Sequence, residues 1–227
     1  SARLLLVAYR SILSSALADE SLDRAMLAHL LSVPQLGGLI EQAEVADVES
    51  IYTARESLLT HLASELAVKF AELFEVVPAT TVYRADSGSI ANRALRNLCL
   101  SYLLRGNEAR WAGVVFQQFQ NANNMTDQLA ALRMLVAGKT TESEKLANRA
   151  LDDFYQRWCD EPLVVDQWLS VQAVAQKPGT LSTVEALIDH PAFELKNPNK
   201  VRALIGTFCS QNHLGFHDIS GAGYAFL

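Results

Sequence analysis

The sequence predicts an all-α fold, a superhelical α-solenoid built from antiparallel helix pairs in the manner of HEAT and armadillo repeats. Two observations support this prediction. Apolar residues recur every three or four positions along almost the whole chain of 227 residues, and no stretch shows the alternation typical of a β-strand. In addition, the expected helices of the second half of the chain begin at regular intervals, which is the mark of a repeat architecture.

The first part of the chain is expected to form amphipathic helices at residues 4–18, 21–32 and 35–42. Asp47 can then cap a longer helix that runs to about Val77, because Pro78 cannot continue it. We expect these first helices to pack at the start of the solenoid. A discrete four-helix bundle of residues 1–77 is the alternative.

Residues 89–227 predict a series of helix pairs. A connector is expected at residues 79–89, which contain the turn sequence Asp-Ser-Gly-Ser. Helix starts then follow near Ser89, Glu108, Thr126, Thr141, Leu163, Ser182 and Pro198. Every second start gives intervals of 37, 37 and 35 residues, the length of a helix-turn-helix unit that buries its apolar face by stacking on its neighbours.

Local signals at the helix ends support these starts. The segments 141–144 and 182–185 both fit a capping box, in which a hydroxyl and a glutamate satisfy backbone N–H groups at a helix start. Asn197 is expected to cap a helix whose first residue is a proline. Gly106 and Gly138 are expected as left-handed residues that end the preceding helices.

We therefore expect one all-helical domain over residues 1–227, with first helices in 1–77 and helix-pair repeats in 89–227. The chain ends in an apolar stretch, residues 223–227, that carries no charged residue. An apolar end normally needs a surface that covers it. This indicates a fragment that is truncated at its C-terminus.

Composition excludes several classes of protein. The chain is 50% hydrophobic and 19% charged, which is incompatible with a wholly disordered segment. A net charge of −6 disfavours nucleic acid as a partner, and no apolar run is long enough to span a membrane. The odd number of widely spaced cysteines, Cys99, Cys159 and Cys209, favours a reducing compartment and hence the cytoplasm. Each is expected to be a small core residue.

The motifs of common catalytic sites are missing from the sequence. His213 and His217 have the spacing that places two imidazoles on one helical face toward zinc. However, Leu214 occupies the place of the general-base glutamate, and Gly215 argues against a helix, so a loop with two ordinary histidines is favoured. Neither a nucleophile elbow nor a phosphate-binding loop occurs. We expect no catalytic residue and no metal site in this chain.

Several arginines are candidate sites for an anion. Four of them lie close together in the sequence, at Arg93, Arg96, Arg105 and Arg110, and a charged helix surface is favoured over a phosphate site. Arg202 follows the expected helix start and lies beside the apolar stripe of residues 201, 204, 205 and 208. It could therefore reach a concave surface and bind a carboxylate, although capping by the nearby asparagines is the simpler interpretation.

Five segments together resemble the C-terminal helical domain of bacterial aminopeptidase N, a zinc enzyme of the gluzincin class. They are residues 89–100 (SIANRALRNLCL), 121–132 (NANNMTDQLAAL), 152–158 (DDFYQRW), 197–206 (NPNKVRALIG) and 221–224 (GAGY). The resemblance covers nearly the whole chain in order. The chain departs from the family by ending before its last helices and by carrying Asn212-His213 in place of the usual Asn-Pro.

This resemblance implies a function for the intact protein. It implies an aminopeptidase that removes N-terminal residues from peptides with zinc-bound water, where the zinc and the catalytic residues lie in preceding domains. The present chain would cap the catalytic domain of the same polypeptide and restrict access of peptide substrates, and Arg202 would face the cavity as a substrate contact. A stand-alone α-solenoid that binds a peptide or protein is the alternative.

Overall fold

Helices account for the secondary structure of this chain. The structure is a computed structural model that describes residues 2–79 and 82–227, and no β-strand occurs within these two ranges. The helices are α1 (Ala2–Ala18), α2 (Arg24–Leu30), α3 (Leu36–Ile40), α4 (Val48–Glu65), α5 (Ala67–Val76), α6 (Ser87–Gly106), α7 (Glu108–Asn121), α8 (Met125–Val136), α9 (Thr141–Trp158), α10 (Pro162–Ala173), α11 (Thr180–Ile188), α12 (Pro198–Val201), the π-helical η1 (Arg202–Gly206), α13 (Thr207–Gln211), α14 (His213–Phe216) and α15 (Ala222–Phe226). The predicted all-α class is confirmed.

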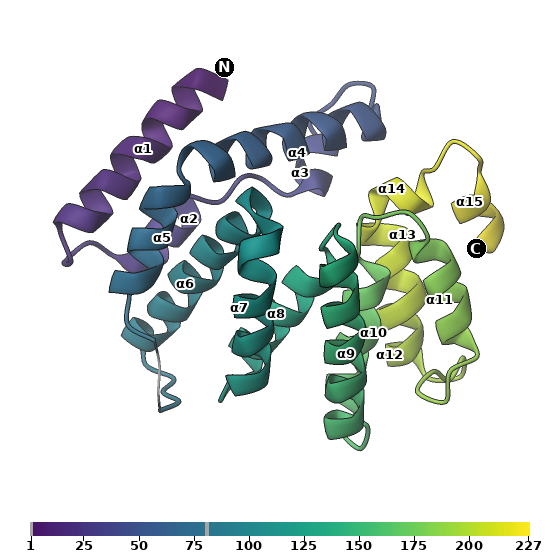
Figure 1. The fold of residues 1–227 in the computed structure, drawn as a ribbon. Coiled ribbons are helices and arrows are strands. Elements are labelled where there is room, and N and C mark those ends of the chain that lie inside the picture. Colours follow the sequence, from purple (N-terminus) through teal and green to yellow (C-terminus); the bar gives the residue numbers. More distant parts are fainter. Residues whose placement is uncertain (1, 80–81) are drawn as a thin grey trace.

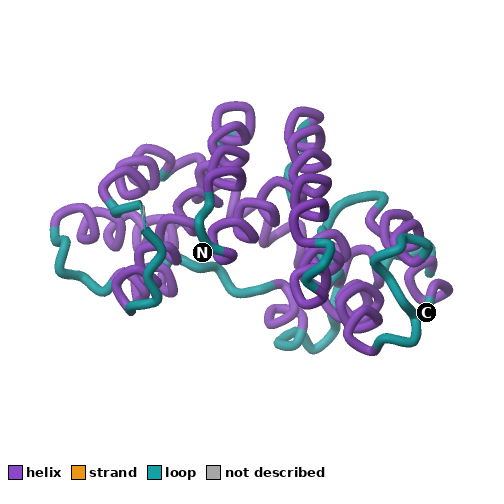
Figure 2. The backbone as a smooth tube through the Cα atoms, turned by 90° about the horizontal axis from the view of Figure 1, so that it is seen from below, coloured by secondary structure: helices purple, strands orange, loops and turns teal. Residues whose placement is uncertain are grey.

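The helices from α6 onward stack as successive antiparallel pairs into a curved array (Figure 1). Helices α6, α8, α10 and α12 begin at Ser87, Met125, Pro162 and Pro198, so successive starts are 38, 37 and 36 residues apart. Neighbours in the chain, such as α7 and α8 or α8 and α9, pack directly on each other. Figure 2 shows the same array from below, with the helices joined by loops. This arrangement confirms the predicted α-solenoid.

Helix α4 makes contacts that reach far beyond its neighbours in the chain. Helix α4 packs against α6, and it also contacts α14, which is formed near the end of the chain. In Figure 1 it lies across the top of the array, reaching from the α6 side toward α13 and α14. The hydroxyl of Tyr52 on α4 donates a hydrogen bond to the backbone carbonyl of Gln176, 124 residues away, at 3.3 Å. Helix α4 therefore connects distant parts of the solenoid.

A single hydrophobic core runs through the array, from Tyr9 on α1 to Phe208 on α13. The rings of Phe70 and Tyr102 stack inside it with centroids 4.3 Å apart. The Tyr102 hydroxyl donates to the carbonyl of Leu31 at 2.9 Å, which satisfies the residue after the end of α2. Burial raises the pKa of Tyr102 well above its ordinary value, so the phenol stays protonated and can donate this bond.

Two of the predicted N-terminal caps are confirmed and two are wrong. Asp47 accepts from the backbone N–H of Ser50 at 2.9 Å, and Asn197 caps α12. Thr140, rather than Thr141, caps α9, because the two hydroxyl residues are adjacent and either could precede the helix. Helix α11 already starts at Thr180, after a left-handed Gly179, so the proposed box at residues 182–185 lies inside the helix.

Three further local expectations are wrong. Within the described residues positive φ occurs only at Gly179 and Gly221, so Gly106 and Gly138 are not left-handed residues that end the helices. The long helix expected from Asp47 breaks at Leu66, whose φ of −114° separates α4 from α5.

The histidine segment forms a short helix, α14, where a loop was expected. The side chain of Asn212 caps this helix by accepting from the N–H of Gly215 at 2.9 Å. Gly215 therefore does not prevent helix formation, because the asparagine cap compensates for its low propensity.

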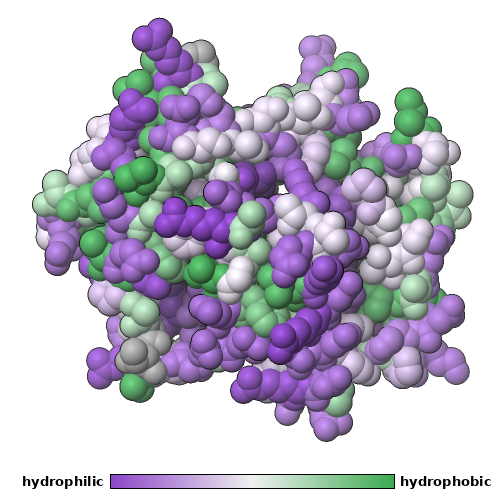
Figure 3. Space-filling model, viewed as in Figure 1, coloured by the Kyte–Doolittle hydropathy of each residue, from purple (hydrophilic) through white to green (hydrophobic). Residues whose placement is uncertain are grey.

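The surface drawn in Figure 3 is mixed, with hydrophilic side chains interspersed with smaller hydrophobic patches. None of the helices in the described part of the chain is long and apolar enough to cross a membrane. The three cysteines are free: Cys99 is buried as expected, whereas Cys159 is exposed and Cys209 is half-buried. The expectation that all three are core residues is therefore wrong for Cys159.

Candidate functional site

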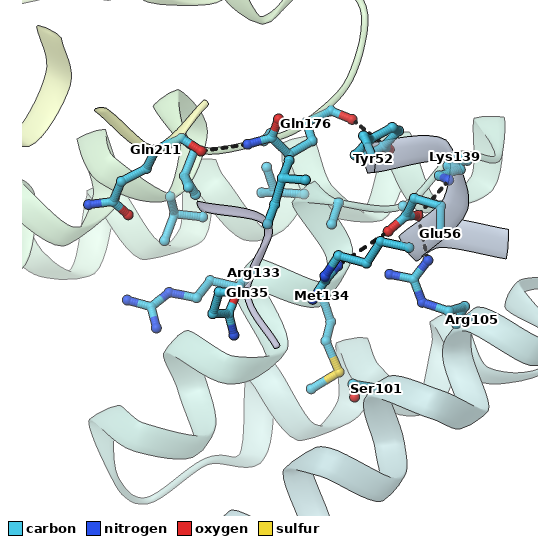
Figure 4. Close-up of a pocket in the computed structure, with 18 of the residues that line it drawn as sticks. Gln35, Tyr52, Glu56, Ser101, Arg105, Arg133, Met134, Lys139, Gln176 and Gln211 are labelled. Carbon is cyan, nitrogen blue, oxygen red and sulfur yellow. Dashed lines mark hydrogen bonds and ion pairs between the residues drawn. The ribbon is translucent and has the colours of Figure 1, made fainter. Parts of the chain in front are cut away.

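A cavity of about 870 Å³ lies where α4 crosses the solenoid (Figure 4). Its walls come from both ends of the chain: α3 and α4 on one side, α6 and α8 below, and α10, α13 and the start of α14 on the other side. A pocket of about 300–1,000 Å³ is the size that typically holds a small ligand. The crossing of α4 thus creates a concave site of the size that binding requires.

Glu56 is the centre of a charged cluster in this cavity. Its Oε2 accepts from Arg105 Nη1 at 2.5 Å and from Lys139 Nζ at 3.1 Å, while Arg55 Nη1 lies 3.6 Å from Oε1 (Figure 4). The Glu56 side chain is only 14% exposed. Burial by itself would raise the pKa of Glu56, but the hydrogen bonds and charges of Arg105 and Lys139 outweigh it and hold this pKa below its ordinary value.

The opposite wall is held by a glutamine. Gln176 Nε2 donates to the carbonyl of Gln211 at 2.6 Å, and its Oε1 accepts from the backbone N–H of Leu214 at 3.1 Å (Figure 4). On the other side, Arg55 Nε donates to the carbonyl of Pro34 at 2.8 Å. These bonds tie loops to helices around the cavity, so its shape depends on contacts between distant segments.

The cavity is positively charged, although the chain as a whole is acidic. Its cationic side chains are Arg55, Arg105, Arg133 and Lys139, and its carboxylates are Glu56 and Glu108. These groups sum to a formal charge of +2, against −6 for the complete chain. The Glu108 side chain is already hydrogen-bonded to the turn before α9, because one of its oxygens accepts from the backbone N–H groups of Lys139 and Thr140 at 2.8 and 3.0 Å. The arrangement favours an anionic or peptide-like ligand.

The two histidines singled out from the sequence do not fit a zinc site. Their rings are stacked with centroids 6.1 Å apart, and Nδ1 of His217 lies 2.5 Å from the hydroxyl of Tyr224. Burial, followed by the charge of His217, lowers the pKa of His213, which lines the cavity. Zinc is held by four ligands or by three and a water, and no group of three or more His, Cys, Asp or Glu side chains gathers among the described residues.

Arg202 lies outside this cavity. It is the first residue of η1, its side chain is exposed, and within the described chain that side chain makes no hydrogen bond or ion pair. The buried cation of this segment is instead Lys200, whose Nζ lies 2.9 Å from Asp166 Oδ1 and donates to the carbonyl of Pro162 at 3.0 Å. Of the stripe that the sequence indicated, Leu204 and Phe208 are buried and Val201 and Ile205 are half-buried, so the buried face extends to Lys200 but not to Arg202.

The expected charged surface of α6 and α7 is only partly correct. Arg110 is exposed, with its guanidinium 5.2 Å from the ring centroid of Trp111. Arg93 is buried, Arg96 is half-buried, and Arg105 belongs to the cavity. Positions 93 and 96 lie seven residues before the buried positions 100 and 103, so helical spacing already contained the signal that they face inward.

This chain matches a known protein family and several characterised relatives. A family described as a domain of unknown function (DUF3458_C) with ARM repeats matches residues 5–227. Aminopeptidase N of Escherichia coli (strain K12) is 36% identical over 220 residues, and aminopeptidase N of Caulobacter vibrioides is 37% identical over 219 residues. These matches cover 97% and 96% of this chain but only 24% and 25% of the relatives, so the chain spans about a quarter of their length.

A solved structure agrees with these relatives. The crystal structure of Legionella pneumophila aminopeptidase A in complex with aspartic acid has a TM-score of 0.84 and 34% identity, and it matches 97% of this chain and 26% of that one. The resemblance to the C-terminal domain of aminopeptidase N is confirmed by the sequence matches. The chain belongs to the DUF3458_C family of ARM-repeat domains.

Proposed function

We propose that this chain is the non-catalytic C-terminal domain of a zinc-dependent aminopeptidase that removes N-terminal residues from peptides. The observation that carries the proposal is the 36–37% identity to two proteins named aminopeptidase N along 96–97% of this chain. In this proposal the metal and the catalytic groups lie in other parts of the polypeptide. Zinc would supply a Lewis acid and an activated water there.

The domain organisation follows from the same proposal. Residues 1–227 form one helical domain, with first helices in 1–77 and helix-pair repeats in 89–227. One continuous hydrophobic core, which includes residues of both ranges, supports a single domain. The partner of the domain is the catalytic domain of the same polypeptide. The three free cysteines support a reducing compartment, and we propose the cytoplasm.

We propose that the domain caps the catalytic domain and restricts access to its active-site cavity. A curved wall of stacked helices presents a concave side on which extended ligands can lie. Its cavity of about 870 Å³ has room for a short peptide, and its charge of +2 complements a peptide carboxylate. Large folded substrates would be excluded by such a wall, whereas short peptides would pass.

Arg202 is the residue that we propose to contact substrate. Its guanidinium is exposed and has no partner among the described residues, so it is available for bidentate binding of a carboxylate. We expect Arg202→Ala in the full-length enzyme to raise KM for peptides long enough to reach it, while KM for an alanyl chromogenic substrate stays unchanged. Unchanged kinetics across all peptide lengths would remove Arg202 from the site.

Two assays test the main proposal. The 227-residue chain supplied with zinc should not hydrolyse an alanyl chromogenic substrate, whereas the full-length polypeptide should, and turnover by the chain alone would overturn the assignment. A second assay compares the full-length enzyme with a variant that lacks residues 1–227, using the chromogenic substrate to verify that the catalytic domain is intact. We expect the variant to lose discrimination between short and long peptides, and retained discrimination would refute the capping role.

The gene provides an independent test. Without an H-E-x-x-H segment upstream of Ser1, the chain would be a stand-alone α-solenoid that binds peptide or protein.

A further inference from the structure

A second, smaller cavity of about 330 Å³ lies between the end of α5, the first half of α6 and the turn from α7 to α8. We call it the amide pocket, because its lining is rich in side-chain amides, from Asn97, Gln117, Gln118, Asn121 and Asn123. Its charged residues are Arg93, Arg96 and Asp127. It shares no lining residue with the larger cavity, so it is a separate site.

Arg93 is an unusual residue for the wall of a pocket, because it is only 5% exposed. One of its nitrogens, Nη1, donates to the carbonyl of Arg84 at 3.0 Å, and the guanidinium lies 5.3 Å from the ring centroid of Tyr83. Its Nε is buried and has no hydrogen-bond partner within the described residues. A buried cation that is paired with no anion destabilises the folded protein unless another group compensates it.

Arg96 stands one helical turn further along α6, is half-buried, and is likewise held by backbone carbonyls. Its Nη1 donates to the carbonyls of Phe74 and Val77 at 2.5 and 2.6 Å, which satisfies the C-terminal end of α5. Burial lowers the pKa of Arg96. Neither Arg93 nor Arg96 forms an ion pair with a carboxylate in the described part of the chain.

The carboxylate of the pocket is already in use. Asp127 Oδ1 accepts from Asn97 Nδ2 at 2.8 Å, and its Oδ2 accepts from Asn124 Nδ2 at 2.8 Å. Gln118 in turn donates to Asn97 at 2.7 Å, so the amides form a chain that orients Asp127 toward them. With two guanidiniums and one carboxylate, the amide pocket keeps a formal charge of +1.

We propose that the amide pocket binds one oxyanion, a carboxylate or a phosphate group, through Arg93 and Arg96. Guanidinium groups prefer such anions because two parallel N–H groups match two oxygens, and the buried Nε of Arg93 is one donor that lacks a partner. The exposed amides of Gln117 and Asn121 can donate to the remaining oxygens. The backbone carbonyls that bind the two arginines are neutral, so they leave the positive charge of the guanidinium groups uncompensated. An anion would compensate it.

Two sources can supply this group. One is a small free anion in solution. The other is an Asp or Glu side chain from the rest of the polypeptide, since the chain spans about a quarter of the length of its relatives. Both sources use the same chemistry at Arg93, and the experiment separates them.

The test uses crystals of the full-length polypeptide, grown without phosphate or carboxylate buffers and then soaked in selenate, whose anomalous signal locates it. We expect either a selenate peak within hydrogen-bond distance of Arg93 or, before soaking, an Asp or Glu side chain from another part of the polypeptide at that place. Both results support the site and distinguish its source. The proposal would be overturned if the crystals showed neither selenate nor a carboxylate at Arg93 and its Nε were bonded to water or to a carbonyl.

A solution measurement complements the crystals. Thermal unfolding of the full-length polypeptide is followed while sodium phosphate or acetate replaces sodium chloride at constant ionic strength. For a free anion we expect a midpoint that rises with concentration, and an affinity that falls about tenfold to hundredfold in Arg93→Gln. Arg93→Lys keeps the charge and should bind with intermediate affinity, so the proposal stays testable if Arg93→Gln does not fold. Arg110→Gln, which removes an exposed arginine that does not line the pocket, is the matched control and should bind like the wild type.

For an intramolecular carboxylate the same measurement gives a different result. Added anions should then leave the wild-type midpoint unchanged, while Arg93→Gln lowers it more than Arg110→Gln does. Equal anion responses in the wild type and in Arg93→Gln, or equal losses in Arg93→Gln and Arg110→Gln without an anion response, would contradict the proposal.

Discussion

The charge of Glu56 stabilises the contact of α4 with α6 and with the turn between α8 and α9, and Glu56→Gln removes that charge with little change in shape. In the variant, Arg105 and Lys139 lose their carboxylate, while Arg55 loses its nearest anion. The amide of the glutamine can keep one hydrogen bond but cannot balance three cations. The expected result is a less stable chain.

The size of this loss follows from the burial of the partners. Removing one member of a buried ion pair costs about 3–5 kcal/mol, whereas exposed pairs contribute about 0–1 kcal/mol. The side chain of Glu56 is 14% exposed, but those of Arg105 and Lys139 are 30% and 62% exposed, so solvent screens much of the interaction. We therefore expect a loss of about 2 kcal/mol, or about 4–8 °C in Tm for a chain of this size.

Thermal unfolding of the wild type and the variant at several pH values measures this loss. The pKa of Glu56 in the folded chain lies below its ordinary value of 4.5, so its ionised form stabilises the fold above that pH. This contribution disappears as the pH falls through the folded-state pKa. The difference between the wild type and Glu56→Gln should therefore be full at pH 7 and shrink below about pH 4.5.

The matched control is Glu142→Gln, which removes a carboxylate from an exposed pair. Glu142 lies 3.9 Å from Lys145, and the two side chains are 66% and 71% exposed. We expect a loss below about 0.5 kcal/mol. Equal losses in the two variants, or a Glu56 effect that stays constant from pH 7 to pH 3, would refute the role assigned to the cluster.

Two further predictions concern buried groups. Lys200→Ala leaves the carboxylate of Asp166 without its cation, so denaturant unfolding should show that the free energy of unfolding falls by about 3 kcal/mol. The control Lys145→Ala, at an exposed pair, should lower it by less than about 0.5 kcal/mol. Similar losses would mean that the buried pair is not important for stability. Burial raises the pKa of Cys99 to about 12, so its thiol stays protonated at pH 8. A thiol reagent at this pH should modify the exposed Cys159 in the folded chain and react with Cys99 only after unfolding. Rapid modification of Cys99 would show that its helix opens readily.

Local features of the fold could be predicted because they depend on neighbouring residues. The caps at Asp47 and Asn197 involve an acceptor and N–H groups two or three residues away, and both were predicted correctly. The break at Leu66 has no such signal, since neither glycine nor proline stands there. We attribute it to packing, because α4 bridges α14 and α6 while α5 packs on α6 and α1.

Features that depend on distant contacts were missed. Glu56 meets Arg105 and Lys139 across 49 and 83 residues, and one sequence without relatives does not indicate which charges will pair. The buried face of α12, η1 and α13 is wider than the expected stripe. Lys200 lies at helical spacing from Leu204 and Phe208, so it is buried on the same face as these two residues of the stripe.

The crossing of α4 has a mechanical consequence. A solenoid joined only through adjacent repeats behaves like a spring, because each unit can bend or unravel without disturbing those farther away. Here helix α4 acts as a strut: it packs on α6 at one end of the array and is bonded through Tyr52 to Gln176 toward the other, so it fixes the spacing between them. Stretching or fraying therefore has to break this strut, so the array should respond to force as one rigid arch.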